Sequence, residues 1–542
     1  MNTKKSLLHI LFILLLSSLA YAKKAPNFVV IYIDDLGWAD TSVPMIQDNE
    51  DSKSDFHQTP ALEKLAKNGM VFSKGYSPAP TCTPSRISIQ YGMSNARLGY
   101  TTVHDVLAEK RGKKKQILKD GVSIAHILKQ SNKNYVTAHF GKGIEIAFMK
   151  KLGYDITDEN DIGPNGNFHG EKVSLKNQSE LPQDDPKRIY SVTDASVQFI
   201  KDQATNKEPF FMMVSHYSAH VPHAASPEII EKYRKLPRGK YLTDMDYMDP
   251  TKMSRGYREC VWRLQYAAMV EETDTSLGKI MEALEKTGQM DNTYVIFTSD
   301  NGGGILPNGS LTGGKATLME GGIRVPTVIS GPGVKKGGYC SIPMTQIDLY
   351  PTIHDLSGAK NTLPENLDGG SLREVLKNGN SGTIKRNMPG IIFNYPYYAG
   401  APVNAIIQGD YKLMQQLNTK QYRLHNITSD LGEKNNLAET QPEKVKELAS
   451  IMDTYLQQVN AAQIQDVYVA RINELEGWKV MDQNNYNNDM KKIENMNDDQ
   501  KALFKARIEK RLKDNLSRHD KQIKECLTQK KNTQWIGMLV EN

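Results

Sequence analysis

Runs that predict strands, most of them largely apolar, recur along the first 300 positions, and amphipathic segments separate them. The runs span 27–33, 70–76, 135–140, 209–214 and 293–298. Apolar residues without alternation are typical of strands buried on both faces, as in a parallel sheet. Segments with helical spacing lie between the runs, over 59–69, 122–130, 193–203 and 261–287. Strands that alternate with helices in this way predict an α/β fold, a large and mostly parallel sheet flanked by helices.

The pattern changes near residue 380. Short strands separated by turns are predicted around 391–393, 405–407, 411–413 and 422–424, followed by a helix over 443–459. This order predicts a smaller antiparallel sheet with a packed helix. From about 462 the chain is rich in Lys, Asn, Asp and Gln, and stretches such as 500–516 indicate a helical extension. We therefore expect an N-terminal α/β domain over 23–380, a C-terminal α+β subdomain over 381–461 and an extension over 462–542.

The first 22 residues have the pattern of a secretory signal peptide. Lys4 and Lys5 precede the apolar run 7–19, and Ala20-Tyr21-Ala22 has the small-x-small form of a cleavage site. The run is short for a membrane span, and no later segment is long and apolar enough to cross a bilayer. We expect export to the periplasm or the medium, without stable membrane insertion.

Charge and cysteine content exclude several classes of function. The net charge of +6 over 542 residues comes from mixed signs, which suits an anionic substrate but gives no indication of nucleic-acid binding. The four cysteines have no CxxC spacing, which excludes a cysteine zinc site and a disulfide scaffold. One bridge among Cys260, Cys340 and Cys526 stays open.

Oxygen-bearing side chains follow two of the buried runs. Asp34 and Asp35 come directly after the first, and Asp300 and Asn301 come after the last. Adjacent acids on a loop are often merely solvated, but an open α/β sheet places its site at the carboxyl ends of its strands. Oxygen ligands without His or Cys suit a hard divalent cation, Ca²⁺ or Mg²⁺, rather than zinc.

Several cationic or titratable residues are candidates for binding an anion. Lys142 and Lys315 both stand beside glycines, where the backbone can approach a ligand closely, although a solvent-exposed charge is the ordinary alternative. His220 follows the run 209–214 and can donate a proton to a leaving oxygen. Isolated histidines are more often structural. Three further residues are candidates for substrate binding without a more specific role: His139, His223 and Arg324.

The segment Cys82-Thr83-Pro84-Ser85-Arg86 is unusual for a protein core. Because Pro84 disfavours helical geometry at the residue before it, we expect Cys82 to lie in a turn and a helix to begin near Ser85. A helix start suits an anion, and Arg86 can bind one in a bidentate manner. The alternative is a small buried thiol beside a helix cap.

Over 25–455 these motifs, in this order, resemble the type I sulfatases, the formylglycine-dependent sulfatase family of the alkaline-phosphatase-like superfamily. The matching segments are 27–37, 59–69, 82–92, 219–222, 299–302, 315–326, 411–413 and 430–437. The resemblance implies that a maturation enzyme oxidises Cys82 to formylglycine, whose hydrated form attacks the sulfur of a sulfate ester. It implies Ca²⁺ ligands at Asp34, Asp35, Asp300, Asn301 and the modified Cys82. It also implies that Arg86, Lys142 and Lys315 stabilise the sulfuryl charge, with His220 and Lys315 facing the leaving oxygen.

The sequence departs from the family pattern at three places. The family commonly has histidine two residues after the lysine of its G-K-W-H motif, where this chain has Ile144, so the role is vacant or falls to His139 or Glu145. The T-G-R that helps maturation is replaced by Tyr91-Gly92-Met93. Leu431 replaces a proline, which we expect to be inconsequential.

We therefore expect an exported sulfatase acting on a sulfated carbohydrate. One alternative is a phosphoesterase of the same superfamily, although the histidine clusters for two zinc ions are missing. A second is a catalytically weak carbohydrate-binding relative, which the isoleucine at position 144 favours. We expect the determinants of the substrate to lie in the polar segments 40–58, 100–118, 150–190 and 225–260.

Overall fold

The computed structural model describes residues 24–101, 121–144, 146–157, 185, 187–305, 307–396, 402–493 and 498–540. The predicted signal peptide lies outside these residues. The described chain forms two compact units. The first contains the residues up to Pro80, together with Ile89–Gly92 and Val122–Asn387, and the second contains Thr81–Ser88 and the described residues of Met93–Gly121 and Met388–Asn542.

The first unit is built on an eight-stranded sheet with the order β5-β4-β6-β1-β7-β8-β2-β9. Its strands are β1 Asn27–Ile33, β2 Gly69–Phe72, β4 Val136–Gly141, β5 Ile156–Thr157, β6 Phe210–Ser215, β7 Thr293–Ser299, β8 Thr327–Ser330 and β9 Gly338–Cys340. The central strand β1 is fully buried and pairs in parallel with β6 and β7, so that Val30 lies between Met213 and Ile296. Strand β8 is antiparallel to both of its neighbours. The predicted large and mostly parallel sheet is confirmed.

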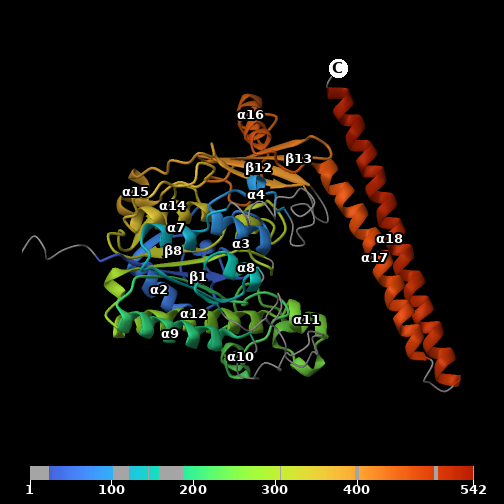
Figure 1. Ribbon diagram of the computed structural model, residues 1–542, viewed down its shortest axis with the longest axis horizontal. Helices are drawn as coiled ribbons and strands as arrows, with labels where there is room; N and C mark the ends of the chain where they lie inside the picture. Colours follow the sequence, from blue (N-terminus) through green and yellow to red (C-terminus); the bar gives the residue numbers. More distant parts are fainter. Residues whose placement is uncertain are drawn as a thin grey trace, which may run out of the picture. The chain divides into compact units, whose positions relative to one another are not determined.

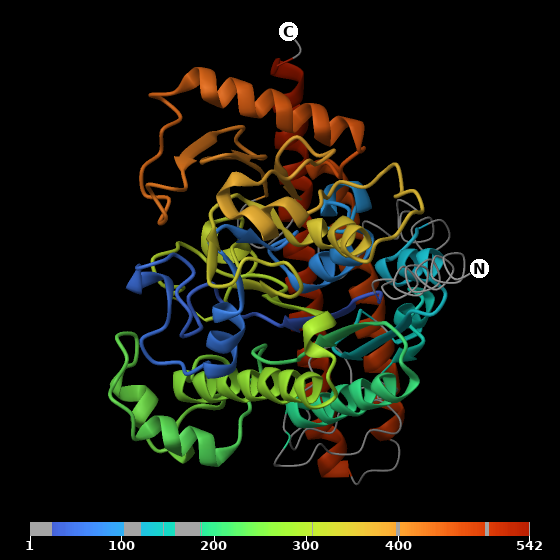
Figure 2. The ribbon, with the colours of Figure 1, turned by 90° about the vertical axis from the view of Figure 1, so that its left-hand side faces the viewer.

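Helices cover both faces of this sheet (Figures 1 and 2). One layer contains α2 (Pro60–Lys67), α9 (Ile189–Asn206) and α12 (Arg263–Lys286), and the other contains α7 (Ile124–Ser131), α14 (Leu349–Leu356) and α15 (Arg373–Asn378). The short helices α8 (Ile146–Lys151), α10 (Pro227–Arg234), α11 (Arg255–Cys260) and α13 (Glu320–Ile323) lie in the connections. The long helix predicted over 261–287 is α12, which contributes one side of the core through Leu264, Leu277 and Leu284.

The strand predicted over 70–76 is divided in two. Strand β2 ends at Phe72, and β3 (Gly75–Tyr76) pairs with β10 (Met344–Thr345) in a separate two-stranded sheet. The carbonyl of Ser73 accepts hydrogen bonds from Trp38 Nε1 (3.2 Å) and Arg324 Nε (2.7 Å). Because this carbonyl already accepts hydrogen bonds from two side chains, it does not pair with a neighbouring strand, and β2 ends before it.

The second unit contains a four-stranded antiparallel sheet with the order β11-β12-β13-β14, as predicted. Its strands are β11 Ile391–Tyr395, β12 Val403–Gln408, β13 Tyr411–Gln416 and β14 Tyr422–Asn426. Helix α16 (Pro442–Gln458) packs on β12 and β13, and α4 (Asn95–Leu98) packs on β11. The amide of Asn95 donates to the carbonyl of Asn394 (2.7 Å), which fixes α4 to the sheet edge.

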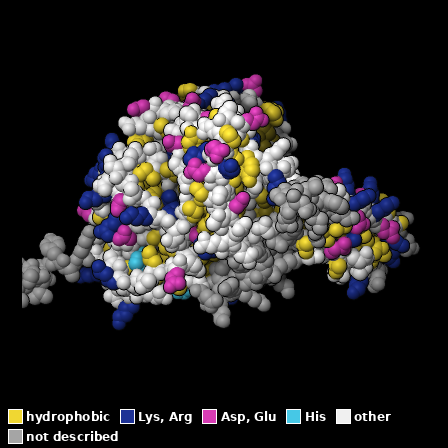
Figure 3. Space-filling model, turned by 90° about the horizontal axis from the view of Figure 1, so that it is seen from above, with side chains coloured by type: hydrophobic (Ala, Val, Ile, Leu, Met, Phe, Trp, Pro, Cys, Tyr) yellow, Lys and Arg dark blue, Asp and Glu magenta, His cyan; other side chains and the backbone are white. Residues whose placement is uncertain are grey.

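Two long helices, α17 (Ile464–Ile493) and α18 (Asp498–Val540), follow in the second unit. They run antiparallel and lie side by side, since Asp489 pairs with Arg511 and Asp482 pairs with His519 (3.0 Å). Basic, acidic and apolar side chains all reach the surface of this pair (Figure 3). Within the described ranges, no helix combines the length and apolar character that crossing a membrane requires. All four cysteines are described and none of them forms a disulfide, so the bridge left open by the sequence is absent.

His216, which follows β6, makes the stability of the first unit depend on pH. Its ring is buried, and Nε2 lies 3.0 Å from Ser276 Oγ. Burial lowers the pKa of His216 from 6.5 to about 4. Between these values the unfolded chain binds a proton that the folded chain does not, so stability falls as pH falls. Because of this residue, we expect the free energy of unfolding to be roughly 3 kcal/mol lower at pH 4 than at pH 7.

Urea unfolding measured across this pH range tests the expectation. The substitution His216→Gln should reduce the slope of stability against pH by the contribution of one proton. A residual slope should remain, because burial also lowers the pKa of His223, to about 3. An unchanged slope in a folded His216→Gln protein would show that the acid sensitivity arises elsewhere.

Candidate active site

The loops that follow β1, β6 and β7 are joined at the carboxyl ends of these strands. The backbone N–H of Asp34 donates to the carbonyl of Ser218 (2.8 Å), and Ala219 donates back to Asp34 (2.6 Å). The backbone N–H of Asp300 donates to Ile33 (3.0 Å). These backbone bonds hold the three loops together beyond the ends of the strands, so polar side chains far apart in the sequence reach one place.

The structure brings four of the five predicted metal ligands together, all of them in the first unit. Asp34, Asp35, Asp300 and Asn301 are each at most 2% exposed. Asn301 Nδ2 donates to Asp35 Oδ1 (2.8 Å), and the backbone N–H of Asp35 lies 3.2 Å from Asp300 Oδ1. Carboxylates at this density repel one another unless cations balance them. We refer to these four residues as the acid cluster.

The backbone at Asp35 is held in an uncommon conformation. Its φ of 62° lies in the left-handed region, which non-glycine residues seldom adopt. Two neighbours stabilise it: Gly304 donates to the Asp35 carbonyl (3.2 Å), and Leu36 donates to Ser299 Oγ (2.9 Å). Such strain costs on the order of 1–3 kcal/mol and is typical of functional sites.

Two lysines provide charge balance. Lys142 Nζ forms a buried ion pair with Asp34, and Lys315 Nζ lies 2.7 Å from Asp35 Oδ2. Lys142 follows Gly141, whose φ is 88° and where an added Cβ would lie 2.0 Å from the carbonyl of Ser215. Only glycine fits there, which explains why a glycine precedes the lysine.

His220 lies beside the acid cluster. Its Nε2 is 3.7 Å from Asp35 Oδ2, and its Nδ1 donates to the carbonyl of Val221. Burial lowers the pKa of His220, and the charges of Asp34 and Asp35 partly offset this effect. The imidazole is therefore neutral at neutral pH, with the proton on Nδ1 and Nε2 directed toward the cluster.

Sequence reasoning missed Lys187, which is 1% exposed. Its Nζ donates to the carbonyls of His220 (2.8 Å) and Pro222 (3.3 Å). Burial lowers the pKa of Lys187 well below 10.5, with Asp34 and Asp35 acting in the opposite direction. The residue belongs to the polar segment 150–190, and no motif marks it, so the sequence offered no signal for this particular lysine.

The three candidates for substrate binding lie in the core. His139 Nε2 is 3.2 Å from Ser215 Oγ, and the His223 ring lies 5.5 Å from that of Tyr266. Arg324 is 1% exposed and pairs with Glu320 (3.2 Å) in addition to its bond to Ser73. These contacts are those of structural residues, and substrate binding by them stays a prediction. Ile144 is half-buried, and Glu145 lies outside the described residues.

Cys82 and Arg86 lie on α3 (Cys82–Tyr91), in the part that belongs to the second unit, and both are buried. The prediction of a helix start near Ser85 is wrong, because the helix begins at Cys82. Pro84 falls within the first turn, where its missing N–H is not needed. The Ser85 N–H already donates to the carbonyl of Thr81 (3.3 Å). In the first unit, the carbonyl of Pro80 accepts from the residue after Lys315 (2.8 Å).

The acid cluster fits a hard divalent cation. All four of its residues offer oxygen atoms as metal ligands, which suits Ca²⁺ or Mg²⁺. The side-chain oxygen of Asn301 is buried and accepts no hydrogen bond from the described residues, because Nδ2 makes both amide contacts, to Asp35 and to Gly302 (2.9 Å). A buried acceptor without a donor is costly, and a cation would satisfy it. Ligand oxygens of Asp34 and Asp35 also lie within 4.8 Å of each other and of a ring nitrogen of His220.

Comparison with known proteins gives consistent results. A family model described as Sulfatase matches residues 26–359, and one described as N-sulphoglucosamine sulphohydrolase, C-terminal, matches residues 314–462. The chain is similar to a protein named Sulfatase from Formosa agariphila, with 28% identity over 80% of this chain and 88% of that protein. It is also similar to N-acetylgalactosamine-6-sulfatase from Rattus norvegicus, with 28% identity over 72% of each chain.

A solved structure shares the fold. The crystal structure of Ps i-CgsB in complex with k-i-k-neocarrahexaose superposes with a TM-score of 0.63 and 25% identity, covering 81% of this chain and 94% of that one. The Sulfatase family model covers more than half of the chain. The chain therefore belongs to the sulfatase family, the sulfuric ester hydrolases of the alkaline-phosphatase-like superfamily.

Proposed function

We propose that the protein removes sulfate from a sulfated carbohydrate, using a formylglycine made from Cys82 and a bound Ca²⁺ ion. The observation that carries the proposal is the buried acid cluster, flanked by Lys142 and Lys315. The names of two related proteins support a carbohydrate substrate: one is an N-acetylgalactosamine-6-sulfatase, and the other was crystallised with neocarrahexaose. The sequence pattern of residues 1–22 supports export, and formation of formylglycine requires a maturation enzyme as partner.

The residues of this chain would act mainly by holding charge. Formylglycine supplies a hydroxyl nucleophile, and the ion, held by the acid cluster and the modified Cys82, supplies positive charge for the sulfate oxygens. Lys142, Lys315 and Arg86 would stabilise the sulfuryl group as its charge shifts, which is usually the largest contribution to catalysis. His220 lies beside Asp35 with its Nε2 directed inward, so that it could exchange a proton with the leaving oxygen.

Hydrolysis of paired esters tests the proposal. We expect kcat/KM for 4-nitrophenyl sulfate to exceed that for 4-nitrophenyl phosphate by at least about a hundredfold, equivalent to roughly 3 kcal/mol of transition-state discrimination. The 6-O-sulfated form of N-acetylgalactosamine should release sulfate as well. A reversed preference would favour the phosphoesterase alternative. Binding of sulfated sugars without turnover would favour the catalytically weak relative.

A further inference from the structure

Lys187 binds two carbonyls of the loop that carries His220. Residues 218–223, which we call the histidine loop, follow β6, and Lys187 Nζ donates to the carbonyls of His220 (2.8 Å) and Pro222 (3.3 Å). The residue between these two is Val221, whose own carbonyl accepts from His220 Nδ1. The ammonium group of Lys187 therefore holds the backbone on both sides of the carbonyl that fixes the imidazole ring.

Other parts of the chain hold the two ends of the histidine loop. At its start, the backbone N–H of Ala219 donates to the carbonyl of Asp34 (2.6 Å). At its end, the backbone N–H of His223 donates to the carbonyl of Glu259 (2.5 Å). Each end of the loop is thus held by a different element, and Lys187 adds two bonds in between.

The turn that carries Lys187 has bonds of its own. It precedes α9, where the carboxylate of Asp185 accepts from the backbone N–H groups of Tyr190 and Ser191 (2.9 Å each). The backbone N–H of Arg188 donates to the carbonyl of Asp185 (3.1 Å), and the φ of Arg188 is 55°. Since these bonds fix the turn at the start of α9, the ammonium group of Lys187 is a fixed point for the histidine loop.

Stability alone does not account for a lysine at this position. Lys187 is 1% exposed, and burial lowers its pKa, whereas the charges of Asp34 and Asp35 act in the opposite direction. Replacing buried charged groups by well-packed apolar ones is often neutral or stabilising, so a buried charge is weak evidence for a stabilising role. The contacts of Lys187 with two carbonyls of one loop indicate a role in placing that loop.

We propose that Lys187 is a positioning residue for His220, which keeps Nδ1 on the Val221 carbonyl and Nε2 directed toward Asp35 and the leaving oxygen. The inference rests on the proposed function, which assigns to His220 the proton that the leaving oxygen takes up. In that step the bond between sulfur and the leaving oxygen breaks, its electron pair stays on the oxygen, and the oxygen takes a proton from Nε2. Nδ1 keeps its own proton throughout.

Two sulfate esters with different leaving groups measure the effect of Lys187→Met, which keeps the length of the side chain but removes its donors. The oxygen of 4-nitrophenol is stable as an anion, whereas that of phenol is more basic and depends more on a proton. We expect the substitution to lower kcat about 10- to 30-fold for phenyl sulfate and less than about 3-fold for 4-nitrophenyl sulfate, with KM little changed. Equal losses for both esters would overturn the proposal.

A double-substitution cycle separates positioning from general damage to the site. If Lys187 acts through His220, Lys187→Met should change phenyl sulfate hydrolysis less than about twofold in the His220→Gln protein. The same loss in both backgrounds would contradict the assignment. Lys129→Met is the matched control, because Lys129 on α7 also donates to a backbone carbonyl, that of Gly153 (3.1 Å). It should keep the activity of the unaltered protein. If Lys187→Met does not fold, Lys187→Gln carries the test, with an expected loss of about 3- to 10-fold for phenyl sulfate.

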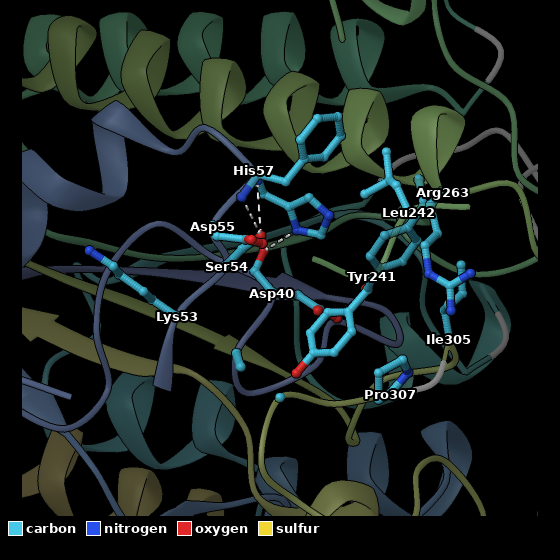
Figure 4. A pocket seen from close by; sticks show the side chains of 14 residues that line it. Asp40, Lys53, Ser54, Asp55, His57, Tyr241, Leu242, Arg263, Ile305 and Pro307 are labelled. Atoms are coloured by element: carbon cyan, nitrogen blue, oxygen red, sulfur yellow. Dashed lines mark hydrogen bonds between the residues drawn. The ribbon is translucent and has the colours of Figure 1, made fainter. Parts of the chain in front are cut away.

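The tautomer of His220 can be measured without turnover, by nitrogen chemical shifts of isotope-labelled histidine at a pH where the ring is neutral. We expect the proton on Nδ1 in the unaltered protein and a mixture of tautomers in the Lys187→Met protein. His57 is the internal reference, since its Nδ1 lies 2.9 Å from the carbonyl of Asp40 (Figure 4). The described residues that line this pocket include neither Lys187 nor a member of the acid cluster, so the His57 signals should not change.

An unchanged His220 spectrum in the folded Lys187→Met protein would overturn the proposal, whatever the activity. If the unaltered protein hydrolysed no sulfate ester, the proposed function would fail by itself. The spectrum would still decide whether Lys187 holds the ring, because the measurement needs neither a substrate nor a converted Cys82.

Discussion

Replacing Cys82 by alanine is expected to lower kcat for a sulfate ester by at least about a thousandfold. Alanine cannot be oxidised to the aldehyde, so the proposed nucleophile is absent while the buried lysines and acids of the first unit stay in place. Initial rates with 4-nitrophenyl sulfate measure the effect. Mass spectrometry of the peptide containing residue 82 should show aldehyde in the unaltered protein.

Cys340→Ala is the matched control, since Cys340 is a buried cysteine outside any disulfide and burial raises its pKa. It should keep full activity. Because Tyr91-Gly92-Met93 departs from the family pattern, conversion of Cys82 can be measured at several levels of co-produced maturation enzyme. Activity should rise in proportion to the aldehyde fraction. Full activity in the Cys82→Ala protein, or in protein that contains only thiol, would contradict the mechanism.

The sequence predicts those parts of the molecule whose structure depends on short, local segments of the chain. After Asn27 the run to Ile33 is apolar and rich in β-branched residues, which predicts a strand buried on both faces, and it is the central strand β1. Asp34 and Asp300 follow parallel neighbours in equivalent register, because Ile33 pairs with Ser299. The carboxyl-end rule for parallel sheets therefore predicts that these two acids lie close together.

Features that depend on contacts between distant segments could not be predicted. The end of β2 depends on Trp38 and Arg324 reaching the carbonyl of Ser73, and neither residue is near it in sequence. Lys187 can be buried because two backbone carbonyls of a distant loop accept hydrogen bonds from its ammonium group. In the same way, Asp246 reads as an ordinary surface acid, and only the fold shows the donors that surround its carboxylate.

Binding and removal of Ca²⁺ are expected to change both the stability and the activity of the protein. Ca²⁺ at about 100 times its dissociation constant should raise the unfolding free energy by about 2.7 kcal/mol, because the ion binds the folded chain and not the unfolded one. A chelator should reverse the increase and abolish sulfate release. Thermal unfolding with and without Ca²⁺ measures the first effect, and the same titration with Mg²⁺ decides between the two ions.

Asp35→Asn should remove most of this stabilisation and lower kcat by at least about a hundredfold, because Asp35 contacts Asn301 within the acid cluster and pairs with Lys315 beside it. Asp355→Asn is the control, since Asp355 is a partly exposed acid that pairs with Arg373 (2.7 Å), and it should respond to Ca²⁺ as the unaltered protein does. If Asp35→Asn kept the full response to Ca²⁺, the ion would bind elsewhere. Because this response needs no modified cysteine, protein that lacks the aldehyde should still show most of it, and the metal site can be tested before maturation is achieved.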